Sequence, residues 1–593
     1  MNYVNYIIMG IQLLGGLGMF LYGMKIMGDG LERVAGEKMA SIIESLTGNI
    51  LKGVLVGTVV TGLIQSSSAT TVMVVGFVNA GIMTLPQAVG VIMGANIGTT
   101  VTAQILRLGD LGGASVLLEF IKPTTLAPLA LIVGLILLVA SKKDKVKETG
   151  GIIIGFGLLF TGMETMSTSV GALKDVEWFR NLFVQFENPV AGILAGTGVT
   201  AIIQSSSGSV GILQAVASAG MVTFASALPI IMGQNIGTCV TALISSIGTS
   251  KNAKKAAMIH LYFNIIGTVV CTTVVYTVHA FVDIPFWNAT MTRGNIADIH
   301  SLFNIICTIM LLPFSKFLIY LANITVGKST DEVQPSKEGA LDKRFLTTPS
   351  VAIGQCHNET NHMMQLAIEN MTLAKDAMIN NNEKAAKKII KNEDSIDDLE
   401  VQLNNYLVLI TDRDLTEQES KTVSGLFHAI TDIERVGDHC NNIAELALDN
   451  IKRGAIFSEK AKKELGAMFD ATLEILHITF QAFENDDVDL IRKVEPLEKV
   501  IDKFNTMLKK KHITRLKQQE CSVRSGVNFL EAINDLERVS DHCSNIAITV
   551  AQKHSNSEDF DMHGYTREAT ERGGAEFEAD YQYFEEKFYS PIA

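Results

Sequence analysis

The sequence Gln-Ser-Ser-Ser at residues 65–68 interrupts an apolar segment, and the same four residues recur at 204–207. Each quartet is followed at the same distance by a second motif, Gly-x-Asn-Ile-Gly-Thr, at 94–99 and again at 233–238. Two motifs repeated in the same order and at the same spacing indicate that part of the chain is duplicated.

The duplication extends over residues 49–105 and 188–244, which align at a constant offset of 139 without a gap, with 27 of the 57 positions identical. In both copies the quartet lies midway along an apolar zone, at 49–83 and 188–222. Four consecutive polar side chains point to every side of a helix, so the quartet predicts a break in each helix. A break at membrane depth is tolerated where it is buried in protein or lines a wet cavity.

Composition places these repeats in a membrane. The chain of 593 residues is 47% hydrophobic with a positive mean hydropathy, which is too apolar for a soluble protein of this length. The first positive residue is Lys25, so we expect the first apolar stretch to be a retained helix and not a cleaved signal. Stretches of about 20 residues, enough for a helix to cross a bilayer, lie at 4–24, 84–106, 113–140, 151–170, 225–248, 256–282 and 298–325.

Lysines in short loops predict the orientation of the repeats. The loop after the first repeat has a single basic residue, Arg107, whereas the equivalent loop after the second has three, so the repeats are expected to be inverted. Inverted repeats with interrupted helices are typical of secondary transporters. We predict an all-α, multi-pass protein of the plasma (inner) membrane, with re-entrant, broken hairpins in repeats at about 4–140 and 151–325. The lysines expected at the cytoplasmic face are Lys142, Lys143, Lys145, Lys147, Lys251, Lys254 and Lys255.

Both interrupted segments lack charge, since none occurs between Lys52 and Arg107 or between Glu187 and Lys251. A site here must use hydroxyls, amides and backbone. Helix N-termini at the breaks would favour an anion, and amide oxygens can coordinate a hard cation such as sodium. An unpaired anion in such a site is costly, so a co-bound cation is expected. A lone serine run would more often serve helix packing, but the repeat in register favours a site.

These motifs resemble the type II sodium-phosphate cotransporters, whose hallmark is the duplicated Gln-Ser-Ser-Ser signature, over residues 1–325. The resemblance implies sodium-coupled symport of inorganic phosphate. The phosphate-binding residues that it implies are Gln65, Ser66, Ser67, Ser68, Gln204, Ser205, Ser206 and Ser207. The sodium-binding residues that it implies are Gln65, Ser68, Asn96, Thr99, Gln204, Ser207, Asn235 and Thr238. The chain lacks the large extracellular loop of the animal members.

The remainder of the chain has a different character. Residues 1–325 carry 17 Lys+Arg and 14 Asp+Glu, a net charge of +3, whereas 326–593 carry 32 and 48, a net charge of −16. An acidic half would repel nucleic acid, so we expect no nucleic-acid partner and favour multivalent cations as ligands. After a polar linker at 326–352, residues 353–553 have the pattern of long amphipathic helices, and 554–593 form an acidic tail expected to dock as a helix.

A second duplication lies in the acidic half. The sequence Asp-x-Glu-Arg-Val-x-Asp-His-Cys occurs at 432–440 and 535–543, and a Glu-x-x-x-Asp pair precedes each copy. A spacing of four places each carboxylate pair on one helix face, and facing pairs in a bundle can bind hard or borderline cations. One copy alone would be better explained as a solvated, salt-bridged face, but two matched copies make a metal site an equally good explanation. The candidates are Glu393, Asp397, Glu434, Asp438, Glu498, Asp502, Glu537 and Asp541.

Adjacent His and Cys residues end both copies, at His439-Cys440 and His542-Cys543. Neighbouring residues point to different faces of a helix and have the wrong spacing for structural zinc. We interpret the cysteines as core residues and the histidines as surface groups or supports of a metal site.

The acidic repeats resemble the PhoU family of tandem three-helix bundles, whose repeated Glu-x-x-x-Asp motif is associated with metal clusters. The resemblance implies divalent or iron-type metal ions and a cytoplasmic, regulatory domain linked to phosphate signalling.

A sodium-coupled phosphate symporter in the lipid bilayer is therefore the leading interpretation. An exporter and a phosphate receptor or sensor that signals through the acidic half stay open as alternatives, and so does the oligomeric state, with a homodimer among the options. An enzyme is not expected, since the sequence has no nucleophile-base set and no Gly-rich phosphate loop.

Overall fold

The computed structural model describes residues 3–35, 49–110, 123–141, 143–173, 184–327, 341–454, 457–518, 523–554 and 574–592, with the isolated positions 176 and 181. The regular elements in these ranges are helices, which confirms the all-α prediction. The chain separates into two units, Met1–Val351 and Ala352–Ala593. Lys142 and part of the predicted linker and tail, at 328–340 and 555–573, lie outside the described residues.

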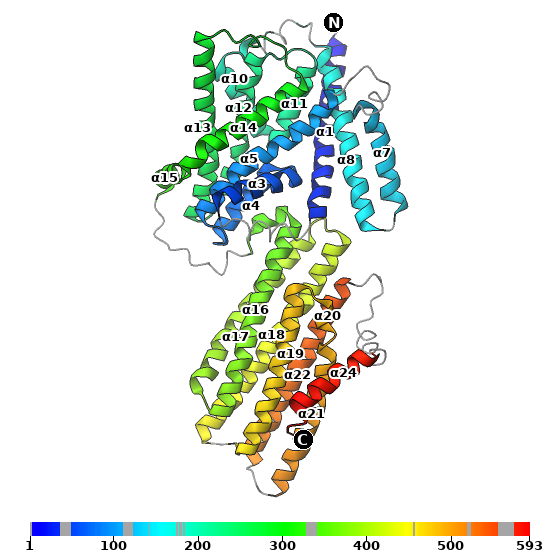
Figure 1. The fold of residues 1–593 in the computed structure, drawn as a ribbon, viewed down its shortest axis with the longest axis vertical. Helices are drawn as coiled ribbons and strands as arrows, with labels where there is room; N and C mark the ends of the chain where they lie inside the picture. The colour runs from blue at the N-terminus through cyan, green and yellow to red at the C-terminus, as the bar shows by residue number, and fades with distance from the viewer. Residues whose placement is uncertain are drawn as a thin grey trace. The chain divides into compact units, whose positions relative to one another are not determined.

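Helices α1 (Tyr3–Ala35), α7 (Pro123–Ala140) and α8 (Asp144–Gly171) pack side by side in the first unit (Figure 1). Facing glycines bring the backbones of α1 and α8 together. A methyl group on Gly23 would lie 2.5 Å from the Leu159 nitrogen, and one on Gly162 would lie 2.4 Å from the Phe20 nitrogen. Close approach through small residues is how helices associate in a membrane, where burial of apolar side chains supplies no extra driving force.

The two repeats fold alike. The first forms α3 (Ile50–Ile64), α4 (Ser67–Asn79) and α5 (Leu85–Arg107), and the second forms α10 (Pro189–Ile203), α11 (Ser206–Ser218) and α12 (Phe224–Ser245). Both predicted breaks occur at the quartets. A methyl group on Gly94 would lie 2.0 Å from the Val54 oxygen, and one on Gly233 would lie 2.1 Å from the Ile193 oxygen. Equivalent glycines therefore allow α5 to pack closely against α3, and α12 against α10.

Helices α13 (Lys251–Phe281), α14 (Arg293–Leu311) and α15 (Ser315–Val326) also belong to this unit. The predicted continuous helix at 298–325 is wrong in one respect, because a 3-10 turn, η2 (Leu312–Phe314), divides it. Pro313 explains the division, since proline lacks the N–H and clashes with the preceding turn. Among the described residues, six helical segments are long and apolar enough to cross a membrane. Of the predicted stretch 113–140, the described part is α7.

The second unit consists of two bundles of three long helices. The first bundle is α16 (Pro349–Asn380), α17 (Glu383–Thr411) and α18 (Glu417–Arg453). The second is α19 (Glu459–Asn485), the short α20 (Val488–Ile491), α21 (Val494–Lys517) and α22 (Val523–His554). Local sequence sets the helix ends: Thr416 and Glu419 form a capping box at the start of α18, and Gly454 ends it in a left-handed conformation. Helices α18 and α22 join the bundles.

The end of the chain lies on the second bundle as α24 (Gly574–Phe584) and the π-helical turn η4 (Glu585–Tyr589) (Figure 1). Glu585 pairs with Lys503 of α21, and the Lys503 nitrogen lies 4.8 Å from the centre of the Tyr589 ring. Lys587 pairs with Glu474 of α19 at 2.8 Å.

Candidate functional site

Gln65 and Gln204 end the first helix of each repeat. Both adopt a left-handed backbone, with φ and ψ of 58° and 21° in one copy and 58° and 22° in the other. This conformation costs a residue with a Cβ roughly 1–2 kcal/mol. Because both copies adopt the same strained conformation, the break is a property of the fold and not a local irregularity.

Ser66 and Ser205 begin the second helices. The Ser66 hydroxyl accepts a hydrogen bond from the Ala69 N–H at 3.1 Å, and the Ser205 hydroxyl accepts one from the Gly208 N–H at 3.1 Å. The N–H groups of the two residues that directly follow Ser66, and of the two that follow Ser205, have no acceptor within their helix. The helix dipole places about half a positive charge at each of these N-termini. Each break therefore presents an N-terminus suited to an anion beside a C-terminus suited to a cation.

The two breaks meet. The hydroxyl oxygens of Ser67 and Ser206 lie 3.4 Å apart, and both residues are buried. Since these residues are equivalent at the offset of 139, their contact lies on the pseudo-twofold axis that relates the repeats. The Ser68 hydroxyl reaches across the axis to the Gln204 carbonyl at 3.5 Å. The structure thus brings both quartets into one uncharged, hydroxyl-rich site between two helix N-termini.

Thr102 belongs to this site, although sequence reasoning did not identify it. Its hydroxyl donates to the Gln65 side-chain oxygen at 2.7 Å and accepts from the Ser207 hydroxyl at 3.2 Å. Its identity with Thr241 in the second repeat is the signal that would have marked it. The second repeat does not reproduce the contact: the Gln204 side chain is exposed, and the Thr241 hydroxyl has no hydrogen-bond partner among the described residues.

The predicted sodium residues of the second motif, Asn96, Thr99, Asn235 and Thr238, are buried on α5 and α12. The Asn96 amide donates to the Ile92 carbonyl at 2.9 Å, and the Asn235 amide donates to the Ile231 carbonyl at 3.0 Å. Both bonds orient the side chain along its own helix. Their part in sodium binding stays a prediction.

The carboxylates of the second unit gather in two groups. Oxygens of Glu498, Asp502 and Asp541 lie within 4.8 Å of one another. Burial and the carboxylates of Asp541 and Asp502 raise the pKa of Glu537, so the fourth predicted member also faces this group. Carboxylate oxygens at this spacing fit the donor set of a hard divalent or iron-type cation.

The first group has the same composition. Burial and the carboxylates of Asp397 and Asp438 raise the pKa of Glu393 to about 7. Burial and Asp438 likewise raise the pKa of Glu434 to about 7. A cation placed here would offset both the burial of these carboxylates and their mutual repulsion, which together raise the two pKa values.

The two groups differ in the residues that surround the carboxylate pairs. The Lys499 ammonium lies 2.9 Å from a Glu498 oxygen and 3.4 Å from a Glu495 oxygen, whereas the residue that follows Glu393 in the first group is Asp394. The second group therefore contains its own cation, which would compete with a metal ion.

The histidines of the second motif are largely buried, with side chains 16% and 12% exposed, and each pairs with a carboxylate of the other repeat. His439 Nδ1 lies 2.9 Å from Asp535, and His542 Nδ1 lies 2.8 Å from Asp432. Their rings stack with centres 5.6 Å apart. The reciprocal pairs join α18 to α22, and the buried Cys440 and Cys543 are core residues.

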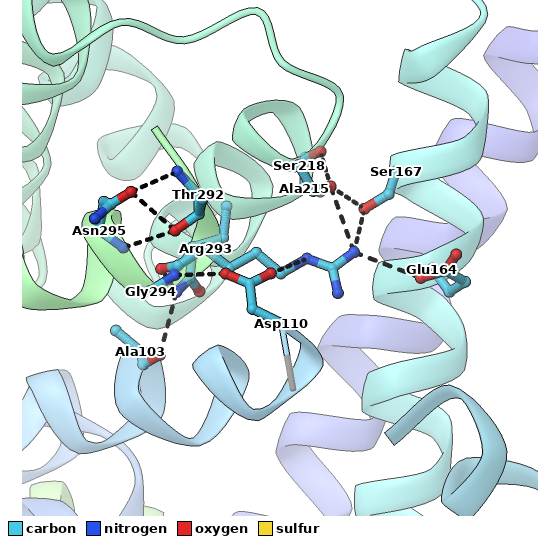
Figure 2. Close-up of polar contacts among 11 residues, drawn as sticks. Ala103, Asp110, Glu164, Ser167, Ala215, Ser218, Thr292, Arg293, Gly294 and Asn295 are labelled. Atoms are coloured by element: carbon cyan, nitrogen blue, oxygen red, sulfur yellow. Dashed lines mark hydrogen bonds and ion pairs between the residues drawn. The ribbon is translucent and has the colours of Figure 1, made fainter. Parts of the chain in front are cut away.

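A charged cluster at the end of α11 was also missed by the sequence reasoning (Figure 2). Arg293, 5% exposed at the start of α14, donates to the Ser167 hydroxyl of α8 at 2.9 Å and pairs with Glu164 at 3.4 Å. Asp110 accepts from the Gly294 N–H at 2.8 Å and lies 4.0 Å from the guanidinium. Ser218, the last residue of α11, lies 3.4 Å from the same guanidinium. A buried arginine of this kind is a signal of function in a membrane protein.

Comparison with known proteins finds two family profiles that match the chain. The profile of the Na⁺/Pi-cotransporter family matches residues 19–168 and 173–291, and the profile of the PhoU domain matches 360–447 and 465–550. A protein of Salmonella typhimurium strain LT2 that bears the name inorganic phosphate export protein YjbB is 23% identical over 553 residues, which cover 93% of this chain and 98% of that protein.

Two further relatives match single parts of the chain. The phosphate-specific transport system accessory protein PhoU homolog 1 of Thermotoga maritima is 29% identical over 195 residues, covering 32% of this chain and 81% of that protein. The sodium-dependent phosphate transport protein 2B of Pongo abelii is 37% identical over 107 residues, covering 18% of this chain and 16% of that protein.

Proposed function

The chain carries a membrane domain of the Na⁺/Pi-cotransporter family followed by a PhoU domain, and from this premise we propose that it is a sodium-coupled symporter of inorganic phosphate. The observation that supports the proposal most directly is the meeting of Ser67 and Ser206, 3.4 Å apart, at two helix N-termini. Phosphate oxygens would accept hydrogen bonds from these hydroxyls and from the free N–H groups of the first helical turns.

The charge of this arrangement supports a role for sodium. The anion carries one to two negative charges near neutral pH, and the two hairpins contain no basic side chain between Lys52 and Arg107 or between Glu187 and Lys251. Helix N-termini supply partial charges only. The C-terminal carbonyls of α3 and α10, together with the oxygens of the quartets and of Asn96 and Asn235, would hold the compensating cations.

The test is phosphate flux in proteoliposomes with and without an imposed sodium gradient. We expect flux only with sodium, and its loss in Ser67→Ala and Ser206→Ala with expression unchanged. Binding of phosphate to purified protein without sodium would contradict the coupling. Absence of sustained flux in either direction, with binding retained, would favour a phosphate receptor.

Export is the second candidate, and the name of the Salmonella relative favours it. The site determines which ions bind, whereas the direction follows from the gradients and the gating. Phosphate-loaded vesicles separate the two candidates: efflux that exceeds uptake at matched, opposite sodium gradients would favour export.

For the PhoU domain we propose metal binding at the two carboxylate groups and control of transport from the cytoplasm. Lys251, Lys254 and Lys255 support a cytoplasmic location for the face where the second repeat ends. A bound metal would supply positive charge that neutralises the clustered carboxylates. If removal of residues 330–593 left folding, flux and the dependence of flux on internal phosphate unchanged, control by this domain would be excluded.

A further inference from the structure

The segment just before the PhoU domain is attached to the first serine-bearing helix. It contains the 3-10 turn η3 (Lys343–Thr347), and it belongs to the membrane unit. The Asn79 amide, at the end of α4, donates to the Asp342 carboxylate at 2.9 Å. Arg344 pairs with the same carboxylate at 2.5 Å and donates to the Ser245 carbonyl, at the end of α12, at 2.8 Å. Asp342 and Arg344 therefore bridge the ends of α4 and α12.

An aromatic contact strengthens this attachment. Phe345 is fully buried, with its ring centre 5.0 Å from that of Phe77 on α4. A methyl group on Gly76 would lie 2.7 Å from the Phe345 ring, so the glycine provides the space that the ring occupies. The end of α4 is thus held by a carboxylate and an aromatic ring from one short segment, and the guanidinium of the same segment holds the end of α12.

The inverted repeat supplies a matching attachment at the other helix. Asn79 is equivalent to Ser218 at the offset of 139, and Ser218 lies in the Arg293 cluster at the end of α11 (Figure 2). The contacts are reciprocal: Asn79 accepts from the Ser250 N–H at 2.9 Å, beyond the second repeat, whereas the Ser218 cluster includes Asp110, beyond the first. Each serine-bearing helix is therefore held at its far end, next to the end of the opposite repeat.

These two attachments differ in origin. The one at α11 is made by residues of the membrane helices and of η1 (Leu108–Asp110), whereas the one at α4 combines the Ser250 N–H with the segment that leads into α16. Helix α4 carries Ser67 and Ser68 at one end and Asn79 at the other. A force applied at residues 342–345 therefore acts directly on a helix of the phosphate site.

We propose that residues 342–345 form a latch on α4 that positions the first quartet and must release during the transport cycle, so that the PhoU domain controls transport through this segment. The inference rests on the proposed transport function. A contact that served only to anchor the linker would remain closed throughout the cycle. Fixing the contact covalently distinguishes the two roles, because it would stop transport if the contact is a latch and would not affect transport if the contact is an anchor.

The test uses the full chain with Asn79→Cys and Asp342→Cys in proteoliposomes. A short bifunctional methanethiosulfonate reagent bridges the two thiols, and a reducing agent releases them. We expect phosphate flux to fall at least tenfold on bridging and to recover on reduction. The single variants, treated in the same way, control for the native cysteines, and the reagent is expected to leave the flux of each at its untreated level.

Unchanged flux in protein shown by mass spectrometry to be fully bridged would overturn the latch, because the contact would then not need to open. Equal inhibition of the single variants would overturn it as well. Flux by the unmodified chain and by the reduced double variant is measured first. Its absence in the unmodified chain would reject the transport proposal itself, so the two failures are distinguishable. If the double variant does not fold, Gly76→Cys with Phe345→Cys provides a second pair across the same contact.

Discussion

At the residue scale, identical sequences in the two repeats make different contacts. Gln65 is held by Thr102, while Gln204 is exposed and Thr241 has no partner among the described residues. If the two halves of an inverted repeat exchange conformations, the binding site between them opens to the opposite side of the membrane. The asymmetry therefore suggests that the bond from Gln204 to Thr241 forms in the other state, when the bond from Gln65 to Thr102 breaks.

Thr102→Val and Thr241→Val form a matched pair for this idea. Each removes one hydroxyl at nearly constant volume, and a hydrogen bond contributes about 1 kcal/mol, so we expect the phosphate KM to change by roughly fivefold. The phosphate KM should change on one side of the membrane in Thr102→Val and on the other side in Thr241→Val, as measured by uptake and efflux in oriented proteoliposomes. Equal changes on the same side for both variants would contradict an exchange between the repeats.

Lys499 gives a second prediction at this scale. Its ammonium lies against Glu498, so Lys499→Gln removes a competing cation, and we expect Mn²⁺ to bind the second carboxylate group roughly tenfold more tightly. Lys462→Gln is the control, because Lys462 pairs only with the exposed Glu459 one turn away among the contacts described. Equilibrium dialysis of the full chain measures the affinity, and equal changes in both variants would reject the role of Lys499.

The carboxylates also predict a pH dependence. The pKa values of Glu393 and Glu434 are raised to about 7, above the ordinary value near 4.3 in an unfolded chain. The folded state therefore binds more protons between these values, and the metal-free unit loses stability as the pH rises through this window. A metal ion replaces the protons, so its affinity rises with pH. We expect a lower Tm at pH 7.5 than at pH 5.5 for metal-free protein, and a reversed order with Mn²⁺.

The quartets and the paired carboxylates were recognisable from sequence because each is duplicated, and duplication separates a site from ordinary helix packing. Thr102 and Arg293 were not recognised for a physical reason. Thr102 is one hydroxyl in an apolar helix, and the partners of Arg293 come from η1, α8 and α11, which only the tertiary structure brings together.

At the scale of the elements, the repeated quartets predicted the broken hairpins, and the sequence pattern after residue 353 predicted long amphipathic helices. The tandem bundles were expected from the resemblance to the PhoU family. The division between α14 and α15 was missed although Pro313 marks it, because apolar length alone was taken as the sign of a spanning helix. The close packing of α5 on α3 could not be predicted from the sequence either. The glycines at 57 and 94 allow it only because the two helices face each other in the folded structure.

The Arg293 cluster joins α8, α11 and α14, and its removal should affect all three. Arg293→Gln leaves Glu164 and Asp110 without their buried cation, so we expect a loss of about 2 kcal/mol in stability and at least a tenfold loss of flux. Arg107→Gln is the control, since the pair of Arg107 with Asp298 is half exposed and such pairs contribute at most about 1 kcal/mol. Thermal unfolding in detergent and flux in proteoliposomes measure both effects. Similar losses in the two variants would show that the cluster has no special role.

At the scale of the whole molecule, the chain offers two truncation points that separate the latch from the PhoU domain. A protein that ends at Val351 keeps the contacts of Asp342 and Phe345 with α4 and of Arg344 with α12, whereas one that ends at Gly327 loses them. If the PhoU domain acts through this segment, both truncations should abolish the response of flux to internal phosphate. Only the shorter protein should also show an altered phosphate KM, because only there is the end of α4 released. Measured side by side in proteoliposomes, equal KM values in the two proteins would mean that the PhoU domain acts on transport by another route.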